Sequence, residues 1–124
     1  MTAITVTTTW MDKDGNIHAV KGDSFDLMLY DIVDSNGATI NFNGWTALFQ
    51  ARVFPNDETV VLEMDETDGI DLSIPGVIRI TKDAEEMILS AKEYYYDLQM
   101  TEPEGHTATW FNKKKILMEG DVAR

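Results

Sequence analysis

Apolar and polar residues alternate along most of this chain, a period of two that is typical of half-buried β-strands. The clearest case runs from Trp45 to Val53, where every second residue is apolar or small. Phe25, Leu27 and Leu29 repeat the same period earlier in the chain. By this alternation we predict strands at 2–10, 17–20, 24–33, 38–42, 45–53, 59–64, 77–81 and 115–122, together with a hairpin within 93–110. The strand at 2–10 is expected to pair within its own sheet, because long unpaired edges are avoided.

Turn residues separate these strands at short intervals. The segment 34–37 reads Asp-Ser-Asn-Gly, and Asn-Gly accepts the positive φ angles of a tight turn. Many short strands with frequent turns predict an all-β fold, an antiparallel immunoglobulin-like β-sandwich in which residues 1–124 form a single domain. One segment breaks the alternation: Asp83 is a good N-cap and Glu86 follows three residues later, so a short helical segment is predicted at about residues 83–90.

Three consecutive tyrosines open the hairpin within 93–110. Side chains of a strand point alternately to its two faces, so Tyr94 and Tyr96 are predicted to face the core. Tyr95 is predicted to face outward, which makes it a candidate for contact with a partner. The sequence that leads into Tyr94 is similar to a tyrosine corner, in which the hydroxyl bonds to the backbone just upstream.

The second arm of this hairpin supplies the other candidate partner contacts. Trp110 and Phe111 are neighbours, so a regular strand would turn them to opposite faces and expose one of them, although large aromatic residues are mostly buried. Lys113, Lys114 and Lys115 form the basic run of the chain. This run is either a solvated edge or a surface that docks onto an acidic neighbour, such as another copy of the chain.

Charge and composition exclude several classes of function. The 124 residues carry a net charge of −12, from 10 Lys and Arg against 22 Asp and Glu. Such a surface repels nucleic acid and anionic lipid, so neither nucleic acid nor a membrane is expected as a partner. No apolar run approaches the roughly 18 residues of a membrane span. The chain has no cysteine, which excludes disulfides and thiolate metal sites.

Candidate chemistry is sparse. The histidines, His18 and His106, lack the nucleophile, phosphate loop or His-Glu metal motif that would point to an active site. We therefore expect a protein that is not an enzyme, with no catalytic, cofactor-binding or metal-binding residue and no cofactor. A hydrolase that uses Asp65 or Asp71 is the weakest alternative. Calcium binding by the carboxylates of loop 65–71 stays open, although a solvated acidic loop is the simpler interpretation.

The C-terminal half resembles small virion proteins of tailed bacteriophages. The matching residues are Tyr94, Tyr96, Asp97, Leu98, Gly105, Thr107, Thr109, Gly120, Asp121, Val122 and Arg124. The upstream part is similar to the N-terminal domain of siphophage baseplate upper proteins. It matches at Gly22, Asp23, Phe25, Gly37, Gly44 and Arg52, whereas Ala123 stands where threonine is usual in the pattern.

This resemblance implies a structural or accessory virion protein, made in the host cytoplasm and present in many copies. Its partners would be other virion proteins and further copies of itself, and head decoration, neck, and tail or baseplate all remain open as locations. Docking would use aromatic anchors inside a polar rim. The alternative is a carbohydrate-binding or host-adhesion module, in which Tyr95, Trp110 and the acidic loop 65–71 bind a glycan.

Overall fold

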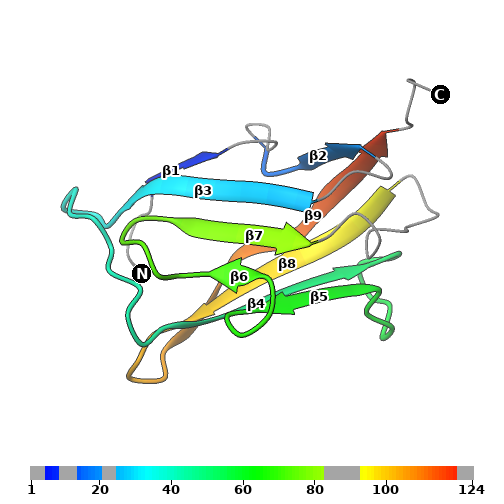
Figure 1. Cartoon of the computed structure of the whole chain (residues 1–124). Coiled ribbons are helices and arrows are strands. Elements are labelled where there is room, and N and C mark those ends of the chain that lie inside the picture. The colour runs from blue at the N-terminus through cyan, green and yellow to red at the C-terminus, as the bar shows by residue number, and fades with distance from the viewer. Residues whose placement is uncertain (1–4, 9–13, 21–24, 83–92, 120–124) are drawn as a thin grey trace.

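The computed structural model of the chain describes residues 5–8, 14–20, 25–82 and 93–119. These residues form nine strands in two sheets and no helix (Figure 1). The strands are β1 (Thr5–Thr8), β2 (Ile17–Val20), β3 (Phe25–Val33), β4 (Thr46–Arg52), β5 (Leu62–Asp65), β6 (Ile70–Asp71), β7 (Ile78–Lys82), β8 (Glu93–Thr101) and β9 (Thr107–Glu119). The helical segment predicted at 83–90 lies outside the described residues. Within the described ranges, no helix is long and apolar enough to cross a membrane.

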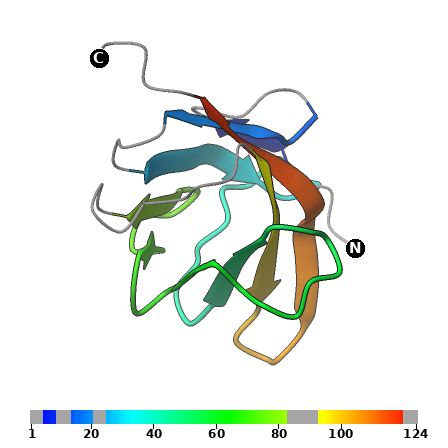
Figure 2. The same ribbon diagram turned by 90° about the vertical axis from the view of Figure 1, so that its right-hand side faces the viewer.

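The two sheets lie face to face (Figure 2). Sheet A has the strand order β1-β3-β7-β6, and sheet B has the order β2-β9-β8-β4-β5. The predicted all-β class is therefore confirmed for the described residues. The N-terminal strand pairs within the molecule, since β1 is hydrogen-bonded to β3, as the sequence predicts.

One pairing departs from the predicted antiparallel arrangement. β2 and β9 run parallel, with Ile17 opposite Ile116 and Val20 opposite Glu119, whereas the other strand pairs are antiparallel. The first two strands are thus divided between the sheets, with β1 in sheet A and β2 in sheet B. Alternation within a strand specifies which face is buried but not the direction of its neighbour, so the sequence pattern missed this pair.

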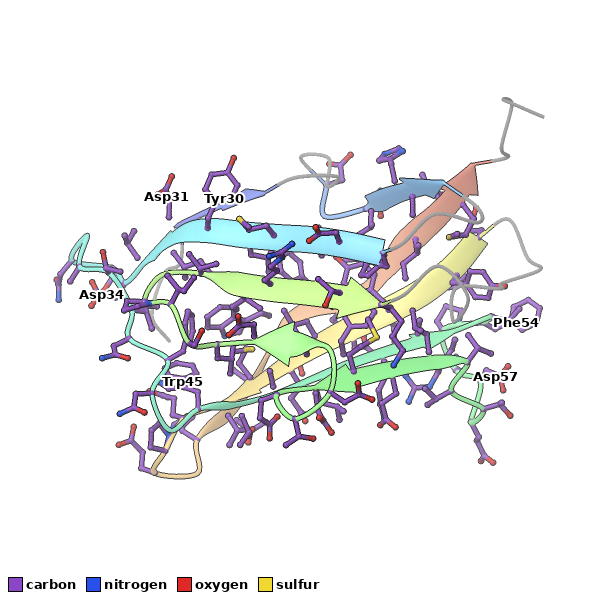
Figure 3. All side chains as sticks on the ribbon, viewed as in Figure 1. Tyr30, Asp31, Asp34, Trp45, Phe54 and Asp57 are labelled. Atoms are coloured by element: carbon purple, nitrogen blue, oxygen red, sulfur yellow. The ribbon has the colours of Figure 1, made fainter. Side chains whose placement is uncertain are left out.

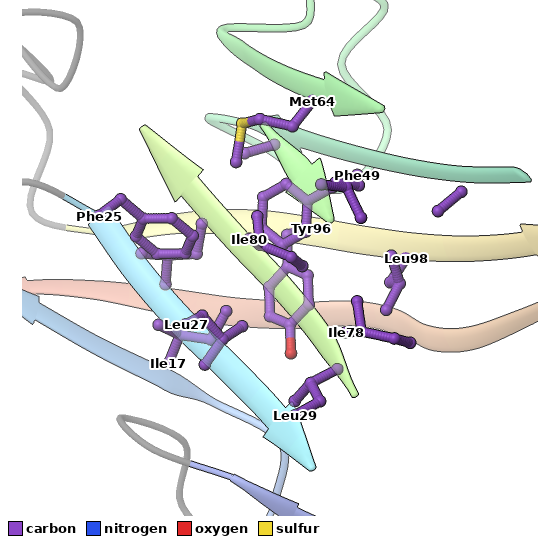
Figure 4. Close-up of a cluster of buried hydrophobic side chains, with 14 of the residues drawn as sticks. Ile17, Phe25, Leu27, Leu29, Phe49, Met64, Ile78, Ile80, Tyr96 and Leu98 are labelled. Carbon is purple, nitrogen blue, oxygen red and sulfur yellow. The ribbon is translucent and has the colours of Figure 1, made fainter. Parts of the chain in front are cut away.

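The core fills the space between the sheets (Figure 4). Inward residues of both sheets contribute to it. The predicted alternation is confirmed in β4 and in β3 as far as Leu29, but at Asp31, whose φ is 55°, it shifts by one residue, so that Ile32 is buried. The buried residues of these two strands are Phe25, Leu27, Leu29, Ile32, Ala47, Phe49 and Ala51. Phe25 of sheet A and Phe49 of sheet B meet with ring centroids 6.0 Å apart. Full burial of each such large side chain contributes about 1.5–3 kcal/mol, so this face holds the sandwich together without any disulfide.

The segment 38–42, predicted as a strand, has only one isolated bridge, between Val33 and Thr39. It crosses from sheet A to sheet B instead. The segment forms a hydrogen bond with the β6–β7 loop, where the amide of Gly76 donates to the carbonyl of Ile40 at 2.7 Å. The Gly76 carbonyl in turn accepts from the amide of Ile32 in β3 at 3.0 Å. A segment that crosses between sheets can have the same short alternation of apolar and polar residues as a strand. The alternation therefore predicts a strand at 38–42 where the structure has a crossing segment.

Two irregularities shape β9, which merges the predicted strand at 115–122 with the second hairpin arm. Between the pairs Tyr96–Lys114 and Leu98–Phe111, β9 has one residue more than β8. Lys113 sits in this bulge with φ 54°, and its amide donates to Asp97 Oδ1 at 2.7 Å. A second bulge follows between Leu98 and Gln99. Bulges bend a strand and redirect its side chains, so regular alternation does not hold across β9.

Candidate functional site

The tyrosine run belongs to the core hairpin, as predicted, and is divided by the pleat. Tyr94 and Tyr96 are buried, whereas Tyr95 is half-buried on the outer face of sheet B. Tyr96 stacks on Phe49 with centroids 5.0 Å apart and donates its hydroxyl to the Gly15 carbonyl at 2.6 Å. The tyrosine corner predicted at Tyr94 is a separate feature, and the residues just upstream that it would involve lie outside the described part of the chain.

Tyr95 is held in place by residues on both sides. Its hydroxyl donates to Glu93 Oε1 at 3.2 Å, and Lys115 Nζ lies 3.2 Å from the same carboxylate oxygen. The lysine nitrogen also lies 5.9 Å from the centre of the tyrosine ring. The Glu93 carboxylate, and the Tyr95 beside it, raise the pKa of Lys115 above its usual value. Glu93, Tyr95 and Lys115 therefore form a fixed group on the outer face of sheet B.

A polar network continues from Tyr95 across the same face. Arg52, opposite Tyr95 in register, places Nη1 3.5 Å from Asp97 Oδ2 and donates from Nη2 to Gln50 Oε1 at 3.0 Å. Gln50 in turn donates to Glu63 of β5 at 2.8 Å. Side chains that are linked in this way lose little further rotamer freedom when a partner binds, which favours contact.

Phe54 lies two residues beyond Arg52 and is 66% exposed. Figure 3 shows it projecting from the end of the molecule that is opposite Trp45. Phe54 is not among the predicted contacts, although an aromatic residue just before the turn at Pro55 is a signal of exposure. We call Arg52, Phe54, Glu93, Tyr95 and Lys115 together the Tyr95 face.

The three lysines do not form one patch. Lys115 belongs to the Tyr95 face, and Lys113 is exposed in its bulge. Lys114 lies opposite Tyr96 in register, and its stem runs beside Gly15, because a methyl group placed there would lie 3.4 Å from Lys114 Cδ. Only part of the basic run is therefore available to a partner on the outer face of sheet B.

Trp110 and Phe111 differ from the expectation that they face opposite ways. Both are partly buried and both pack against the core. Trp110 contacts Phe42 with centroids 6.0 Å apart, and Phe111 contacts Tyr96 at 6.2 Å. The cause is the second bulge of β9, which places Trp110 between the paired residues Thr109 and Phe111. Neither ring is an exposed anchor, and their assignment as partner contacts stays a prediction.

The carboxylates of loop 65–71 are engaged in local bonds. Asp65 accepts from the amide and hydroxyl of Thr67 at 2.9 and 2.6 Å, which lowers the pKa of Asp65. Glu66 accepts from the Ala47 amide at 3.0 Å, and Asp68 pairs with Lys82 at 3.6 Å. Among the described residues, no group of three or more histidine and acidic side chains is arranged to hold a metal ion. A solvated loop with internal capping bonds agrees with this geometry.

The glycan site expected from Tyr95, Trp110 and this loop does not assemble. Tyr95 pairs with Arg52 at the end of β4, whereas Glu66 caps Ala47 near its start. Five residues of extended strand separate these points by about 17 Å. The three features therefore do not converge on one ligand.

A hollow that the sequence pattern does not predict lies at the Trp45 end of the molecule. It has a volume of about 900 Å³ and lies between the segment 34–45 and the β8–β9 turn. Trp45 and Trp110 both line it, although 65 positions separate them in the chain. Both residues stand beside predicted turns, but nothing in a single sequence indicates that those turns meet.

Comparisons with known proteins give little beyond this geometry. No family model matches the chain, and no curated protein matches it. Among solved structures, the chain is similar to murine CRIg, at 11% identity and a TM-score of 0.46, over 96% of this chain and 98% of the other. It is also similar to AggA, the major subunit of aggregative adherence fimbriae type I from Escherichia coli, at 9% identity and a TM-score of 0.39, over 98% and 96% of the two chains. Likenesses this weak carry no argument about function.

Proposed function

We propose that this chain is a non-enzymatic, immunoglobulin-like β-sandwich module that works through protein–protein contact. The observation that carries the proposal is the Tyr95 face. It combines an exposed aromatic ring, Phe54, with a tyrosine and an arginine that their neighbours hold in fixed positions. Tyrosine and arginine are among the residues that dominate binding energy at protein interfaces, and polar groups around them form the rim.

The setting that we propose for this contact is the particle of a tailed bacteriophage, as head decoration, neck, or tail or baseplate component. The support for it is the sequence resemblance across both halves of the chain, together with a net charge of −12 that disfavours nucleic acid and membranes as partners. In this role the chain is made in the host cytoplasm, assembles with other virion proteins and forms homo-oligomers in the particle. It needs neither a cofactor nor a catalytic residue.

Incorporation into particles tests the contact. We expect Phe54→Ser and Tyr95→Ala each to reduce the amount of the chain in purified particles, with at least a tenfold loss of affinity for its neighbour. The matched control is Ile74→Ser, because Ile74 is also an exposed hydrophobic residue, at 55%, but precedes β7 in sheet A. Equal loss in all three variants, or normal incorporation of the first two, would remove the Tyr95 face from the proposal.

The copy number in particles tests the setting. Quantitative mass spectrometry of purified particles is expected to find hundreds of copies for head decoration, or about six to eighteen for a neck or baseplate component, following the closed symmetry of such assemblies. Absence of the chain from particles would overturn the virion role while leaving the contact surface testable with isolated partners.

The alternative is a carbohydrate-binding or host-adhesion module. It predicts that the isolated chain binds a host surface polysaccharide and that Tyr95→Ala abolishes this binding. Co-sedimentation with capsids or tails, with no polysaccharide binding at Tyr95, favours the structural role instead.

A further inference from the structure

The hollow at the Trp45 end is built by two turns that the chain brings together from distant segments. One is the turn at 34–41 and the other is the β8–β9 turn, which closes through a bond from the Glu102 amide to the His106 carbonyl at 2.8 Å. Figure 3 shows Asp34 and Trp45 at this end of the molecule, away from Phe54 and Asp57. The lining consists of Asp34, Ser35, Thr39, Ile40, Asn41, Trp45, Met100, Glu102, His106, Thr107, Ala108 and Trp110. Its volume of about 900 Å³ lies within the range of ligand pockets.

The aromatic part of the lining is rigid. Trp45 meets Trp110 nearly edge to face, with centroids 6.1 Å apart and planes at 71°. Phe42, which is buried, supports both rings, at 5.2 Å from Trp45 and 6.0 Å from Trp110. Edge-to-face rings supported by a third ring keep their orientation, so the hollow has a preformed apolar wall.

Several polar groups around this wall are also fixed. Asp34 Oδ1 accepts from the amides of Asn36 and Ala38, at 2.9 and 3.1 Å. Asn41 Oδ1 accepts from the Asn43 amide at 3.0 Å, which orients the side-chain NH₂ of Asn41. The Thr107 hydroxyl lies 3.0 Å from that of Thr101. Oriented groups of this kind reduce the entropy that a ligand must lose on binding.

The charges of the lining restrict the ligand further. It contains two carboxylates, Asp34 and Glu102, one histidine, His106, and neither lysine nor arginine. The two carboxylates repel an anionic ligand such as a phosphate or a sialylated sugar, and no lysine or arginine of the lining compensates for them. A neutral ligand that is rich in hydroxyl groups suits the mixture of donors and acceptors, since each hydroxyl both donates and accepts.

We propose that this hollow, which we call the Trp45–Trp110 pocket, binds a short neutral oligosaccharide. The C–H face of a sugar ring stacks on the tryptophan wall, because aromatic faces carry partial negative charge and attract weakly positive hydrogens. The ring hydroxyls bond to Asn41, Thr107 and the two carboxylates. A cationic peptide is the competing ligand, since it would also stack on tryptophan and pair with the two carboxylates.

Tryptophan indole signals in NMR test the pocket directly. The chain has three tryptophans, of which Trp45 and Trp110 line the pocket. The full chain with ¹⁵N-labelled tryptophan is titrated with maltotriose, cellotriose and tri-N-acetylchitotriose. We expect at least one of them to shift two indole signals in a saturable way at about millimolar concentration. No shift with any of the three at about ten times that concentration overturns the proposal, as does a saturable shift with trilysine in their place.

Variants of exposed lining residues locate the binding without disturbing the core. Replacing Trp110 removes packing on Phe42, so Asn41→Ala and Thr107→Val are the informative changes. Each is expected to lower the affinity about fivefold, the effect of one hydrogen bond, while the chain stays folded, as circular dichroism checks. The control is Tyr95→Ala, which is expected to leave saccharide binding unchanged. Loss of saccharide binding in Tyr95→Ala but not in Asn41→Ala would overturn the pocket assignment.

This inference is independent of the proposed protein contact. The Tyr95 face and the Trp45–Trp110 pocket lie toward opposite ends of β4, so the variants that test one leave the other intact. Failure of the particle experiments and failure of the saccharide titrations are therefore distinguishable.

Discussion

At the scale of single residues, the hydroxyl of Tyr96 joins two parts of the chain that are 81 positions apart. Tyr96 is 1% exposed, and its hydroxyl reaches the Gly15 carbonyl in the turn that precedes β2. A buried phenol hydroxyl without a hydrogen-bond partner costs free energy. The bond to Gly15 removes this cost and so allows a tyrosine in the core. The same turn contributes Asn16, whose side-chain oxygen accepts from the Lys115 amide at 3.1 Å.

Tyr96→Phe keeps the ring and removes this bond. We expect the free energy of unfolding to fall by about 1–2 kcal/mol, because the buried Gly15 carbonyl loses its partner. Urea unfolding followed by fluorescence measures the change. Tyr95→Phe is the matched control and is expected to change stability by less than about 0.5 kcal/mol, since that ring is half-buried at the surface. Equal effects of the two substitutions would contradict the assignment.

Gly69 is a second residue whose role follows from its surroundings. It has φ 98°, and a methyl group placed on it would lie 2.6 Å from Met64 Cγ and 2.9 Å from the Thr81 carbonyl oxygen. We expect Gly69→Ala to lower the free energy of unfolding by about 2–4 kcal/mol, the sum of left-handed strain and overpacking. Gly105→Ala, with φ 96° and no neighbour within 4 Å, is expected to cost only the strain of about 1–2 kcal/mol. Calorimetric unfolding compares them, and a larger loss at Gly105 would refute the packing argument.

Asp65 gives a pH dependence of known sign. The hydroxyl and amide of Thr67 donate to its carboxylate and hold the pKa of Asp65 below its usual value. A depressed folded-state pKa stabilises the fold above the unfolded pKa of about 3.9, and this contribution disappears as the pH falls through the folded value. We expect Thr67→Ala to raise the pKa of Asp65 and to be less stable than the parent at pH 6, with the difference shrinking towards pH 2. Carboxyl ¹³C titration and urea unfolding are the measurements, and an unchanged Asp65 pKa would count against the capping role.

At the scale of elements, regular strands could be predicted from the sequence and irregular ones could not. Phe25, Leu27 and Leu29 alternate, so the buried face of this part of β3 follows from the pattern, whereas the shift at Asp31 that buries Ile32 does not. In β9 the second bulge, at Trp110, shifts the alternation, so Trp110 and Phe111 both reach the core. Bulges depend on pairing with the neighbouring strand, as the bond from Lys113 to Asp97 shows for the first bulge, and such pairing leaves no signal in the alternation of one segment.

Of the candidate sites, one could also be predicted from alternation and the other could not. The outward direction of Tyr95 follows from its place between two buried tyrosines. The Trp45–Trp110 pocket requires the contact between two distant turns, which depends on the packing of the sheets. Local periodicity carries no information about such contacts, whereas strand order and register specify them.

Asp97→Ala tests the bulge. The substitution removes the carboxylate that accepts from the amide of Lys113, a residue with the uncommon φ of 54°. It also removes a charge partner of Arg52. We expect a loss of about 1–2 kcal/mol in the free energy of unfolding, and faster amide exchange at Lys113 in hydrogen-exchange NMR. Gln99→Ala, two residues along the same face, is the control and is expected to leave exchange at Lys113 unchanged. Unaltered exchange in Asp97→Ala would show that the bulge does not depend on this bond.

At the scale of the whole molecule, early and late parts of the sequence are neighbours. β2 lies beside β9 at one edge of sheet B, and the turn before β2 bonds to both β8 and β9. The fold therefore closes only when residues near both ends of the chain have come together. Non-local closure of this kind is typical of β-sandwiches that fold in milliseconds to seconds.

The parallel pairing of β2 with β9 has a mechanical consequence. Tension applied ahead of β2 and behind β9 pulls the two strands in opposite directions along their common axis, so their hydrogen bonds resist together as a shear joint. Tension applied at Glu93 and Leu117, which face each other across antiparallel β8 and β9, opens the bonds one after another. We expect a higher rupture force in the first geometry, measured with optical tweezers through the substitutions Asp14→Cys and Glu119→Cys, since the chain has no cysteine of its own. Equal forces in both geometries would show that another pair of strands yields first. The parallel pair is therefore expected to resist tension along the strand axis better than the hairpin of β8 and β9.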